Sequence, residues 1–390
     1  MQSYDRNECY ACSMRAKDAD RDGQETVATG EGRQVGQPAT QNAERPRTVT
    51  TMRDIARVAG VSQSTVSRVL NDVPTRVPIA PETRDRVTRA ARQLGYRPNP
   101  LARGLRGAPT MLLGAVVRDI TDPFFAGAIE ALSTTAMSHG YNLVLGHAHG
   151  RADEALALTA VLETRHCDAI VLLGDMQDQP RLLADLADLA VPVVGLWQGS
   201  SPLEVPTVDV DNRAGIVAGL EHLVELGHER IAFVSGRPLG DIRERQAAFS
   251  EFMGERFGGV PEGYLQRVSN TPSGGETAFE ALFELEVPPT AIMTSTDTLA
   301  VGVLHAAYAR GVTVPDELSV VGFDDILLAS HTVPSLTTLR MPNAEIVGEG
   351  VRLAIEFARN PTAPRHSGVT VMAPSLIVRQ STAPPPGRAG

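Results

Sequence analysis

The 390-residue chain has few cysteines and no long apolar run, and each absence excludes a class of protein. Its three cysteines, Cys9, Cys12 and Cys167, are too few for a disulfide-stabilised fold. No stretch approaches the roughly 18–20 apolar residues that a membrane-spanning helix needs. The first twenty residues carry charges throughout and contain no apolar stretch typical of a secretory signal. We therefore expect a cytoplasmic protein with no membrane partner.

The chain also lacks the local motifs of common enzyme classes. It contains no G-x-G-x-x-G, no G-x-S-x-G and no P-loop pattern, and His147 and His149 have no third ligand beside them. Cys9 and Cys12 form an isolated C-x-x-C pair, whereas a zinc site needs four ligands. An enzyme is still one alternative, because α/β folds host many catalysts. We expect no enzymatic activity, no cofactor and no metal.

The net charge of −10 is unevenly distributed along the chain. Residues 51–107 contain eleven arginines and four acids, a net charge of +7. Residues 1–50 contribute −1, so residues 108–390 carry −16. A basic segment joined to an acidic body predicts one part that binds a polyanion and another part with a different partner.

The pattern of apolar residues first predicts a small helical domain. Residues 1–47 are polar and show no periodicity, which indicates a disordered tail. Between residues 48 and 96, apolar residues recur at helical spacing in three short stretches. These stretches begin at residues that favour helix starts, Thr51, Ser62 and Pro81.

From residue 108 the pattern changes to short apolar runs that alternate with helical stretches. Seven runs have this character: 111–117, 141–147, 168–174, 191–197, 230–236, 291–297 and 318–325. Continuous Val/Ile/Leu strands that alternate with helices predict parallel sheets covered on both faces. Their number predicts two doubly wound α/β subdomains within residues 108–382, and the proline-rich residues 383–390 are expected to be disordered.

The first two helices and the turn at residues 59–62 predict a helix-turn-helix whose second helix enters a DNA major groove. Its outward face carries Gln63, Ser64, Ser67 and Arg68, which can contact base edges or phosphates, while its valines turn inward. The alternative is a plain three-helix bundle with a charged surface. Excess arginine and the absence of acids in the second helix argue against that alternative.

Residues 51–71 (TMRDIARVAGVSQSTVSRVLN) closely resemble the N-terminal signature of the LacI/GalR family of transcriptional repressors. The likeness continues in further motifs: ETR (82–84), LGYRPN (94–99), LAR (101–103), DPFF (122–125), VDVDN (208–212), GHERI (227–231) and VGFDD (321–325). One departure is the segment 72–81, which is longer than the usual family spacing. The resemblance implies an all-α DNA-binding domain followed by a periplasmic-binding-protein-like α/β domain, in a homodimer that binds a pseudo-palindromic operator.

The resemblance also implies roles for individual residues. Gln63, Ser64 and Arg68 match the family's base-reading positions, and Arg68 can form a bidentate pair with guanine. A role for Gln63 or Ser64 as a merely solvated side chain is the alternative. Five further residues are better placed for phosphates: Ser62, Thr65, Ser67, Asn71 and Tyr96.

Residues 97–107 match the family's hinge helix, which folds on DNA and enters the minor groove. Within it, Asn99 and Arg103 are expected to contact DNA, and Leu105 occupies the wedge position between base pairs. A flexible linker with an incidental leucine is the alternative.

The two α/β halves resemble sugar-binding proteins of the periplasm, with the boundary expected near 207 and a return crossing near 337. In such sheets ligands lie at the carboxyl ends of strands. Six residues are therefore expected to bind a small-molecule effector, most simply a sugar: Asp122, Phe124, Trp197, Arg245, Asp297 and Asp324. Carboxylates and an arginine suit hydroxyl groups, and an aromatic face covers a sugar ring.

Two of these assignments have structural alternatives. Trp197 can be a core or interface aromatic residue, and Asp297 can cap the helix that begins at Thr298. A solute receptor for transport is the remaining alternative for the whole chain, and the helix-turn-helix pattern argues against it. The identity of the effector, and whether it induces or co-represses, does not follow from the sequence.

Overall fold

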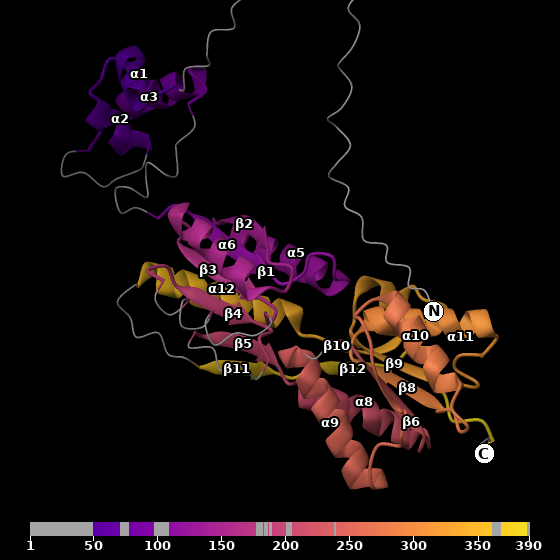
Figure 1. Cartoon of the computed structure of the whole chain (residues 1–390). Coiled ribbons are helices and arrows are strands. Elements are labelled where there is room, and N and C mark those ends of the chain that lie inside the picture. Colours follow the sequence, from indigo (N-terminus) through magenta and orange to yellow (C-terminus); the bar gives the residue numbers. More distant parts are fainter. Residues whose placement is uncertain are drawn as a thin grey trace, which may run out of the picture. The chain divides into compact units, whose positions relative to one another are not determined.

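The computed structural model describes residues 50–70, 78–96, 109–176, 182, 186, 189–199, 205–237, 239–360 and 368–387 (Figure 1). The chain divides into two compact units, residues 1–97 and 98–390. The expected tail 1–47 and linker 97–107 lie outside the described residues. The same holds for four expected DNA-binding residues: Asn71, Asn99, Arg103 and Leu105.

The first unit contains three helices, α1 (Met52–Ala59), α2 (Gln63–Leu70) and α3 (Pro81–Gln93). One small core joins them, and its fully buried members come from all three helices: Ile55, Val66 and Val87. Their spacing along the sequence is the helical periodicity that predicted the three helices. The core thus fixes which face of each helix is left for solvent.

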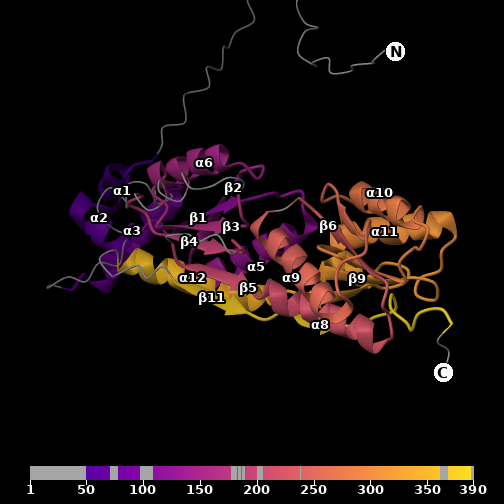
Figure 2. The same cartoon turned by 60° about the horizontal axis from the view of Figure 1, so that its bottom comes forward.

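The second unit consists of two lobes, each built on a six-stranded sheet. The first lobe has the strand order β11-β5-β4-β3-β1-β2, and every neighbouring pair is parallel. Its strands are β1 (Leu112–Val117), β2 (Asn142–His147), β3 (Ala169–Leu173), β4 (Val193–Leu196), β5 (Thr207–Val210) and β11 (Val369–Met372). Helices α5 (Pro123–Ser138) and α12 (Asn343–Arg359) pack together against this sheet, and α6 (Ala152–Thr164) packs on β1 and β2 (Figures 1 and 2).

The second lobe has the strand order β12-β10-β9-β8-β6-β7, with only β12 antiparallel to its neighbour among the described strands. Its strands are β6 (Ile231–Ser235), β7 (Leu265–Arg267), β8 (Ala291–Thr294), β9 (Ser319–Asp324), β10 (Thr337–Arg340) and β12 (Ser375–Ile377). Its helices pack in two pairs, α8 (Asn212–Glu225) with α9 (Gly240–Phe257) and α10 (Pro272–Phe283) with α11 (Asp297–Arg310). The short 3-10 helix η1 (Leu327–Ser330) follows β9.

The chain crosses between the lobes three times. It leaves the first lobe after β5, returns between β10 and α12, and crosses again between β11 and β12. The first two crossings follow the strands that begin at Thr207 and Thr337, so they lie slightly later than the sequence predicts. The third crossing is absent from the sequence analysis because β11 and β12 are only four and three residues long.

The end of the second lobe differs from the expected disordered tail that begins at residue 383. The backbone N–H of Val320 in β9 donates to the carbonyl of Ser381 at 2.8 Å. The backbone N–H of Ala383 donates to Ser319 Oγ at 3.0 Å, and the Ala383 carbonyl accepts from His228 Nε2 at 2.9 Å. Residues 381–383 are therefore attached to the sheet, because these hydrogen bonds outweigh their disorder-prone composition.

Candidate functional site

Local capping interactions position the helix-turn-helix of the first unit. Thr51 Oγ1 donates to Asp54 Oδ2 at 2.7 Å, and the Thr51 backbone N–H donates to the same oxygen at 3.0 Å, which fixes the start of α1. These hydrogen bonds hold the pKa of Asp54 below its usual value. Gly60 ends α1 with a φ of 64°, a left-handed conformation that glycine adopts without strain. The turn that follows places the start of α2.

Helix α2 presents an exposed polar face, which we call the α2 surface: Gln63, Ser64 and Arg68. Ser62 Oγ accepts a hydrogen bond from the Thr65 backbone N–H at 3.1 Å and so caps the helix. Buried Val66 and Val69 on the opposite side of the helix anchor it to the core. The base-reading residues expected from the sequence therefore share one solvent-exposed face.

The expected phosphate-binding residues of the first unit lie beside this face. Ser62 is exposed and lies 2.7 Å from Ser64 and 2.8 Å from Thr65, measured between hydroxyl oxygens. Thr65, Ser67 and Tyr96 are half-buried. Their hydroxyl groups are the kind of donor that contacts DNA phosphates.

A cavity between the two lobes of the second unit gathers five of the six predicted effector residues. We call it the interlobe cavity, and its lining includes Asp122, Phe124, Trp197, Arg245 and Asp324. It lies at the carboxyl ends of strands from both sheets, as expected for this architecture. Its volume is about 10 Å³, which is room for about one water molecule. A sugar-sized molecule therefore requires the lobes to separate.

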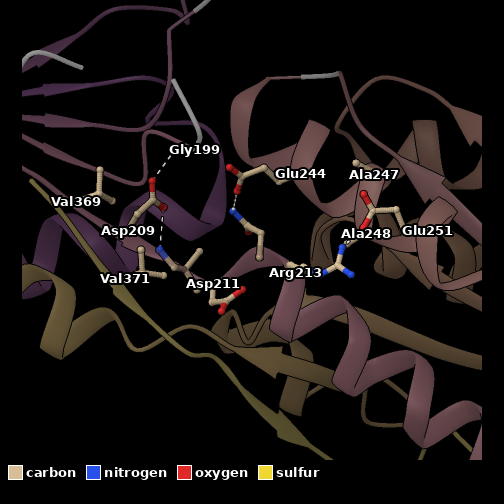
Figure 3. A pocket seen from close by; sticks show the side chains of 12 residues that line it. Gly199, Asp209, Asp211, Arg213, Glu244, Ala247, Ala248, Glu251, Val369 and Val371 are labelled. Atoms are coloured by element: carbon tan, nitrogen blue, oxygen red, sulfur yellow. Dashed lines mark hydrogen bonds and ion pairs between the residues drawn. The ribbon is translucent and has the colours of Figure 1, made fainter. Parts of the chain in front are cut away.

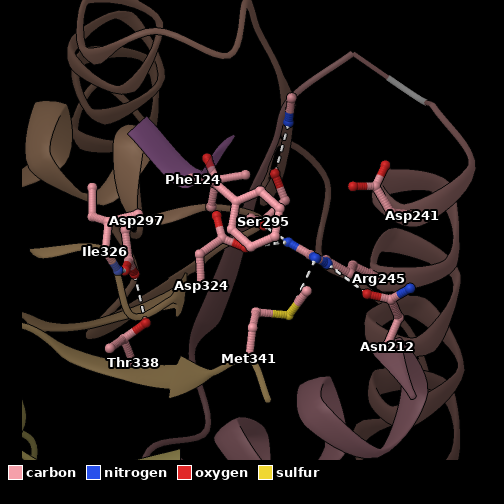
Figure 4. A network of polar contacts seen from close by, with 12 residues as sticks. Phe124, Asn212, Asp241, Arg245, Ser295, Asp297, Asp324, Ile326, Thr338 and Met341 are labelled. Atoms are coloured by element: carbon pink, nitrogen blue, oxygen red, sulfur yellow. Dashed lines mark hydrogen bonds and ion pairs between the residues drawn. The ribbon is translucent and has the colours of Figure 1, made fainter. Parts of the chain in front are cut away.

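Arg245 of α9 is the most connected polar side chain of the cavity, although it is only 2% exposed. Its guanidinium donates to Asn212 Oδ1 at 2.8 Å, to the Ser295 carbonyl at 2.6 Å and to Asp324 Oδ1 at 3.2 Å (Figure 4). It also stacks on Phe323, with 3.7 Å between the guanidinium carbon and the ring centroid. Arg245 therefore holds together α8, the end of β8 and the end of β9.

Burial dominates the electrostatics of the carboxylates in the cavity. It raises the pKa of Asp324 well above the usual value, and the charge of Arg245 offsets part of that rise. Burial likewise raises the pKa of Asp122 at the start of α5. Asp122 accepts from the Phe124 backbone N–H at 3.1 Å and from Asn270 Nδ2 of the opposite lobe at 3.2 Å.

Two aromatic residues form one wall of the cavity. Phe124 and Trp197 meet edge to face, with their ring centroids 5.1 Å apart and their planes at 85°. Trp197 adopts a φ of 55°, an uncommon left-handed conformation for a large side chain. The alternative assignment of Trp197 as a core aromatic is correct in part, because the residue is both buried and part of the cavity lining.

Asp297 does not line the interlobe cavity, and its assignment as a ligand residue finds no support in its position. Its carboxylate accepts from Thr338 Oγ1 at 2.5 Å and from the Ile326 backbone N–H at 2.9 Å, and Figure 4 shows it directed toward these two residues. The alternative assignment as a helix cap is also wrong, because α11 begins at Asp297 and Thr296 is its N-cap. Asp297 instead joins α11 to β10 and to the loop after β9.

The sequence analysis missed the polar residues that join the lobes across the cavity. Arg118, just after β1, pairs with Asp241 in the first turn of α9, with 3.3 Å between Nη1 and Oδ1. Asp175 Oδ2, just after β3, accepts from the Gly240 backbone N–H at 2.5 Å. The strand-end rule that selected Asp122 also applies to Arg118 and Asp175, which follow apolar runs directly.

A second and larger cavity, about 540 Å³, lies beside the strands that connect the lobes (Figure 3). Its lining includes four carboxylates, Asp209, Asp211, Glu244 and Glu251, and one arginine, Arg213. Each of these carboxylates already has a partner within the protein. Burial raises the pKa of Asp209 to about 7. The interlobe cavity remains the better effector site, because it combines aromatic, cationic and anionic groups at strand ends.

Among the described residues, no group of three or more histidine, cysteine or acidic side chains is arranged to hold a metal ion. None of the helices in the part of the chain that the structure describes has the length and apolar character needed to span a bilayer.

Two protein-family models match the chain. Residues 51–99 match the model described as bacterial regulatory proteins, lacI family, and residues 220–382 match that of a periplasmic binding protein-like domain. The HTH-type transcriptional repressor CytR of Escherichia coli (strain K12) is 33% identical over 344 residues, which cover 87% of this chain and 98% of the relative.

Solved structures extend the comparison to the whole architecture. The crystal structure of the lac repressor dimer bound to operator and the anti-inducer ONPF matches with a TM-score of 0.77 at 24% identity. That match covers 86% of this chain and 100% of the other. The transcriptional regulator CelR in complex with cellobiose is 28% identical, with a TM-score of 0.63, over 85% of this chain and 99% of that one.

Proposed function

The chain belongs to the lacI family of bacterial regulatory proteins, and we propose that it binds an operator through α2 under the control of a sugar. The observation that carries the DNA-binding part is the α2 surface. Gln63, Ser64 and Arg68 are exposed together on a helix without acids, while valines on its opposite side fix its orientation. Side chains of this kind read base edges in the major groove.

The remaining DNA contacts are assigned to phosphates and to the minor groove. We assign Ser62, Thr65, Ser67, Tyr96 and Asn71 to phosphate contacts, which set the register on DNA without reading sequence. Asn99, Arg103 and Leu105 are assigned to the minor groove beside each half-site. The match of residues 51–99 to the family model supports this extended set as far as Asn99.

We propose a homodimer with twofold symmetry and a pseudo-palindromic operator, since such symmetry matches two half-sites to two copies of α2. The similar lac repressor structure is a dimer bound to operator. Exposed apolar side chains of the second lobe support self-association of this chain, among them Tyr308, Leu327 and Val333.

The effector is assigned to the interlobe cavity. Its carboxylates can accept hydrogen bonds from hydroxyl groups, and the aromatic wall of Phe124 and Trp197 can cover the apolar face of a sugar ring. The similar regulator CelR is in complex with cellobiose, which supports a sugar as the ligand class. Separation and closure of the lobes around the sugar would then change the affinity for the operator.

We further propose that the protein is a repressor without enzymatic activity and that it acts in the cytoplasm, where bacterial DNA lies. The relative CytR is a transcriptional repressor, which supports the first part. No cofactor enters this proposal.

Selection of operator sequences by the full-length protein tests the proposal. A randomised duplex library should yield a pseudo-palindromic consensus, and fluorescence anisotropy should then show that a sugar changes the affinity for the selected duplex. Failure to select any consensus would contradict sequence-specific regulation. If a consensus is selected but no sugar changes the affinity for it, only the part of the proposal that concerns control by a sugar is contradicted.

A further inference from the structure

Both arginines that line the interlobe cavity are already neutralised by carboxylates. Arg118 pairs with Asp241 at 3.3 Å, and Arg245 pairs with Asp324 at 3.2 Å. Arg118 is 8% exposed and Arg245 is 2% exposed. Water therefore screens these ion pairs less than it screens pairs on the surface.

Arg245 already has its charge compensated by Asp324, although among the described residues its Nη2 contacts only Met341 Sδ, at 4.0 Å. Besides Asp324, it donates to the Asn212 side chain and to the Ser295 carbonyl, and its face lies on Phe323. Moving the guanidinium to a phosphate or carboxylate of a ligand would leave the Asp324 carboxylate buried without its partner. An uncompensated buried charge is costly, so the site resists this exchange.

The lining also contains one carboxylate in excess of its cations. Asp122 receives hydrogen bonds only from the neutral donors Phe124 N–H and Asn270 Nδ2 among the contacts that the structure describes. With Arg118 and Arg245 already paired, the lining residues that the structure describes offer a ligand no free cation. A phosphate group placed here would meet the Asp122 carboxyl and no unpaired guanidinium to compensate its charge.

One polar group of the cavity remains without a partner. Trp197 is 2% exposed, and its Nε1 donates to no acceptor among the described residues. Leaving a buried donor unpaired costs stability, so an unpaired donor in a native cavity indicates an interaction that the protein makes elsewhere in its cycle.

The neighbouring Gln198 holds Trp197 in place. Its Nε2 lies within hydrogen-bonding distance of three carbonyls at the ends of β3 and β4: Leu172 O at 2.9 Å, Gly174 O at 3.2 Å and Leu196 O at 2.9 Å. The Trp197 backbone N–H donates to the Val208 carbonyl at 3.2 Å. These hydrogen bonds fix the backbone at Trp197, so the indole is carried on a rigid support.

We propose that the interlobe cavity selects a sugar without a phosphate or carboxylate group, and that Trp197 is a specificity-determining residue whose indole N–H donates to an oxygen of that sugar. This inference rests on the proposed function, because it specifies the ligand class of the same site. The arginines then act as fixed parts of the wall, and selectivity comes from Trp197 and from the excess carboxylate of Asp122.

Matched pairs of ligands test the charge selectivity on the full-length protein. The probes are glucose with glucose 6-phosphate, galactose with galactose 1-phosphate, ribose with ribose 5-phosphate, and cellobiose, together with glucuronic acid. Trp197 is the only tryptophan of the chain, so its fluorescence reports binding directly. At least one neutral sugar should bind, and its anionic counterparts should bind at least about tenfold more weakly.

The variant Trp197→Phe tests the indole donor, because phenylalanine keeps an aromatic face and removes the N–H. Calorimetry should show about three- to tenfold weaker binding of the neutral sugar. Tyr264→Phe is the matched control, since it removes a ring-borne donor whose partner is the Val287 carbonyl, outside the cavity. Its sugar affinity should equal that of the wild type.

Monodeoxy analogues of the bound sugar separate a direct contact from a packing effect. One analogue should lose affinity for the wild type and show no additional loss with Trp197→Phe, because the two changes remove the same hydrogen bond. Additive losses for every analogue would overturn the role of Trp197.

Binding of a phosphorylated or carboxylated sugar as tightly as its neutral form, or of no neutral sugar at all, would overturn the charge selectivity. Either result would leave sequence-specific operator binding intact. Loss of the proposed function shows instead as failure of operator selection, so the two failures are distinguishable.

Discussion

The α2 surface and the interlobe cavity use polar side chains in opposite ways. On α2, Gln63 and Arg68 project into solvent, and the buried valines hold the helix in place. In the cavity, Arg245 and Asp324 are themselves buried, and they join elements of the second lobe. Residues of the α2 surface, which we propose to contact DNA, can therefore change with little effect on folding. The cavity residues that we propose to bind the ligand also hold the fold together.

The difference follows from what each surface has to bind. A duplex presents its phosphates and base edges on the outside, so a protein meets it with an exposed and basic face. A small ligand is recognised by enclosure, which requires polar groups to be buried and therefore paired before the ligand arrives. Mutations in the interlobe cavity should therefore lower stability, whereas mutations on the α2 surface should change DNA binding and leave stability nearly unchanged.

Arg245→Met gives the largest expected effect and tests whether the cavity arginine is structural. The variant leaves Asp324 buried without its ion pair and the Ser295 carbonyl without its donor, which should lower the free energy of unfolding by about 3–5 kcal/mol. Urea denaturation measures it. Arg256→Met, an exposed position in the last turn of the same helix, is the control and should change stability by less than about 0.5 kcal/mol. Equal stability of the two variants would show that Arg245 is not structural, and it would contradict the difference drawn between the interlobe cavity and the α2 surface.

Arg68→Ala tests the opposite behaviour on the α2 surface. The free energy of unfolding should change by less than about 0.5 kcal/mol, because the side chain is exposed. Discrimination between the selected operator and random DNA should fall by about 1–3 kcal/mol for each contact, as measured by anisotropy. Arg256→Ala serves as the control for loss of charge alone. Equal weakening on operator and random DNA would instead identify Arg68 as a phosphate contact.

The pH dependence of stability should differ between the two units. Burial raises the pKa of Asp209 in β5 to about 7, whereas an aspartate in the unfolded chain titrates near 3.9. The folded state thus binds more protons between these values, and stability falls as pH rises from about 4 to about 7, by at most about 1.4 kcal/mol per pH unit for this group. In the first unit, Asp54 has a lowered pKa and contributes no such fall.

Urea denaturation of the full chain at pH 5, 6, 7 and 8 measures this slope for the second unit. Asp209→Asn should reduce it, because the variant removes one titrating group, whereas Asp297, whose pKa burial also raises to about 7, still contributes. The exposed Asp153→Asn is the matched control and should keep the slope of the wild type between pH 5 and 8, since Asp153 already titrates below its usual pKa. A free energy of unfolding that rises as the pH is raised from 5 to 7 would contradict the raised pKa of Asp209.

The sequence predicts local features of both regions well, because their causes are local. Helical spacing identifies the buried Val66 and Val69 and the exposed Arg68, and the ends of apolar runs locate Trp197 and Asp324. Seven predicted strands are present, while short strands such as β7 and β12 were missed because three residues carry too little pattern.

Long-range contacts account for the errors. Asp297 follows an apolar run as Asp324 does, but Thr338 from a distant strand captures its carboxylate. The pairing of Arg118 with Asp241 joins residues more than a hundred positions apart, and no local pattern contains it. Residues 381–383 are ordered by hydrogen bonds to β9, although their composition predicts disorder.

The central claim is that one chain couples a sugar in the interlobe cavity to an operator on α2, and reciprocal titration tests it most directly. Operator affinity is measured by anisotropy with and without the neutral sugar, and sugar affinity by calorimetry with and without operator. Coupling between two sites is typically about 5- to 150-fold. Because the proposed dimer has two interlobe cavities and binds one operator, thermodynamic linkage requires the change in operator affinity to equal the product of the changes in sugar affinity at the two cavities. The account predicts factors that obey this relation and differ from one. A factor of one in both titrations, with both ligands bound, would contradict it.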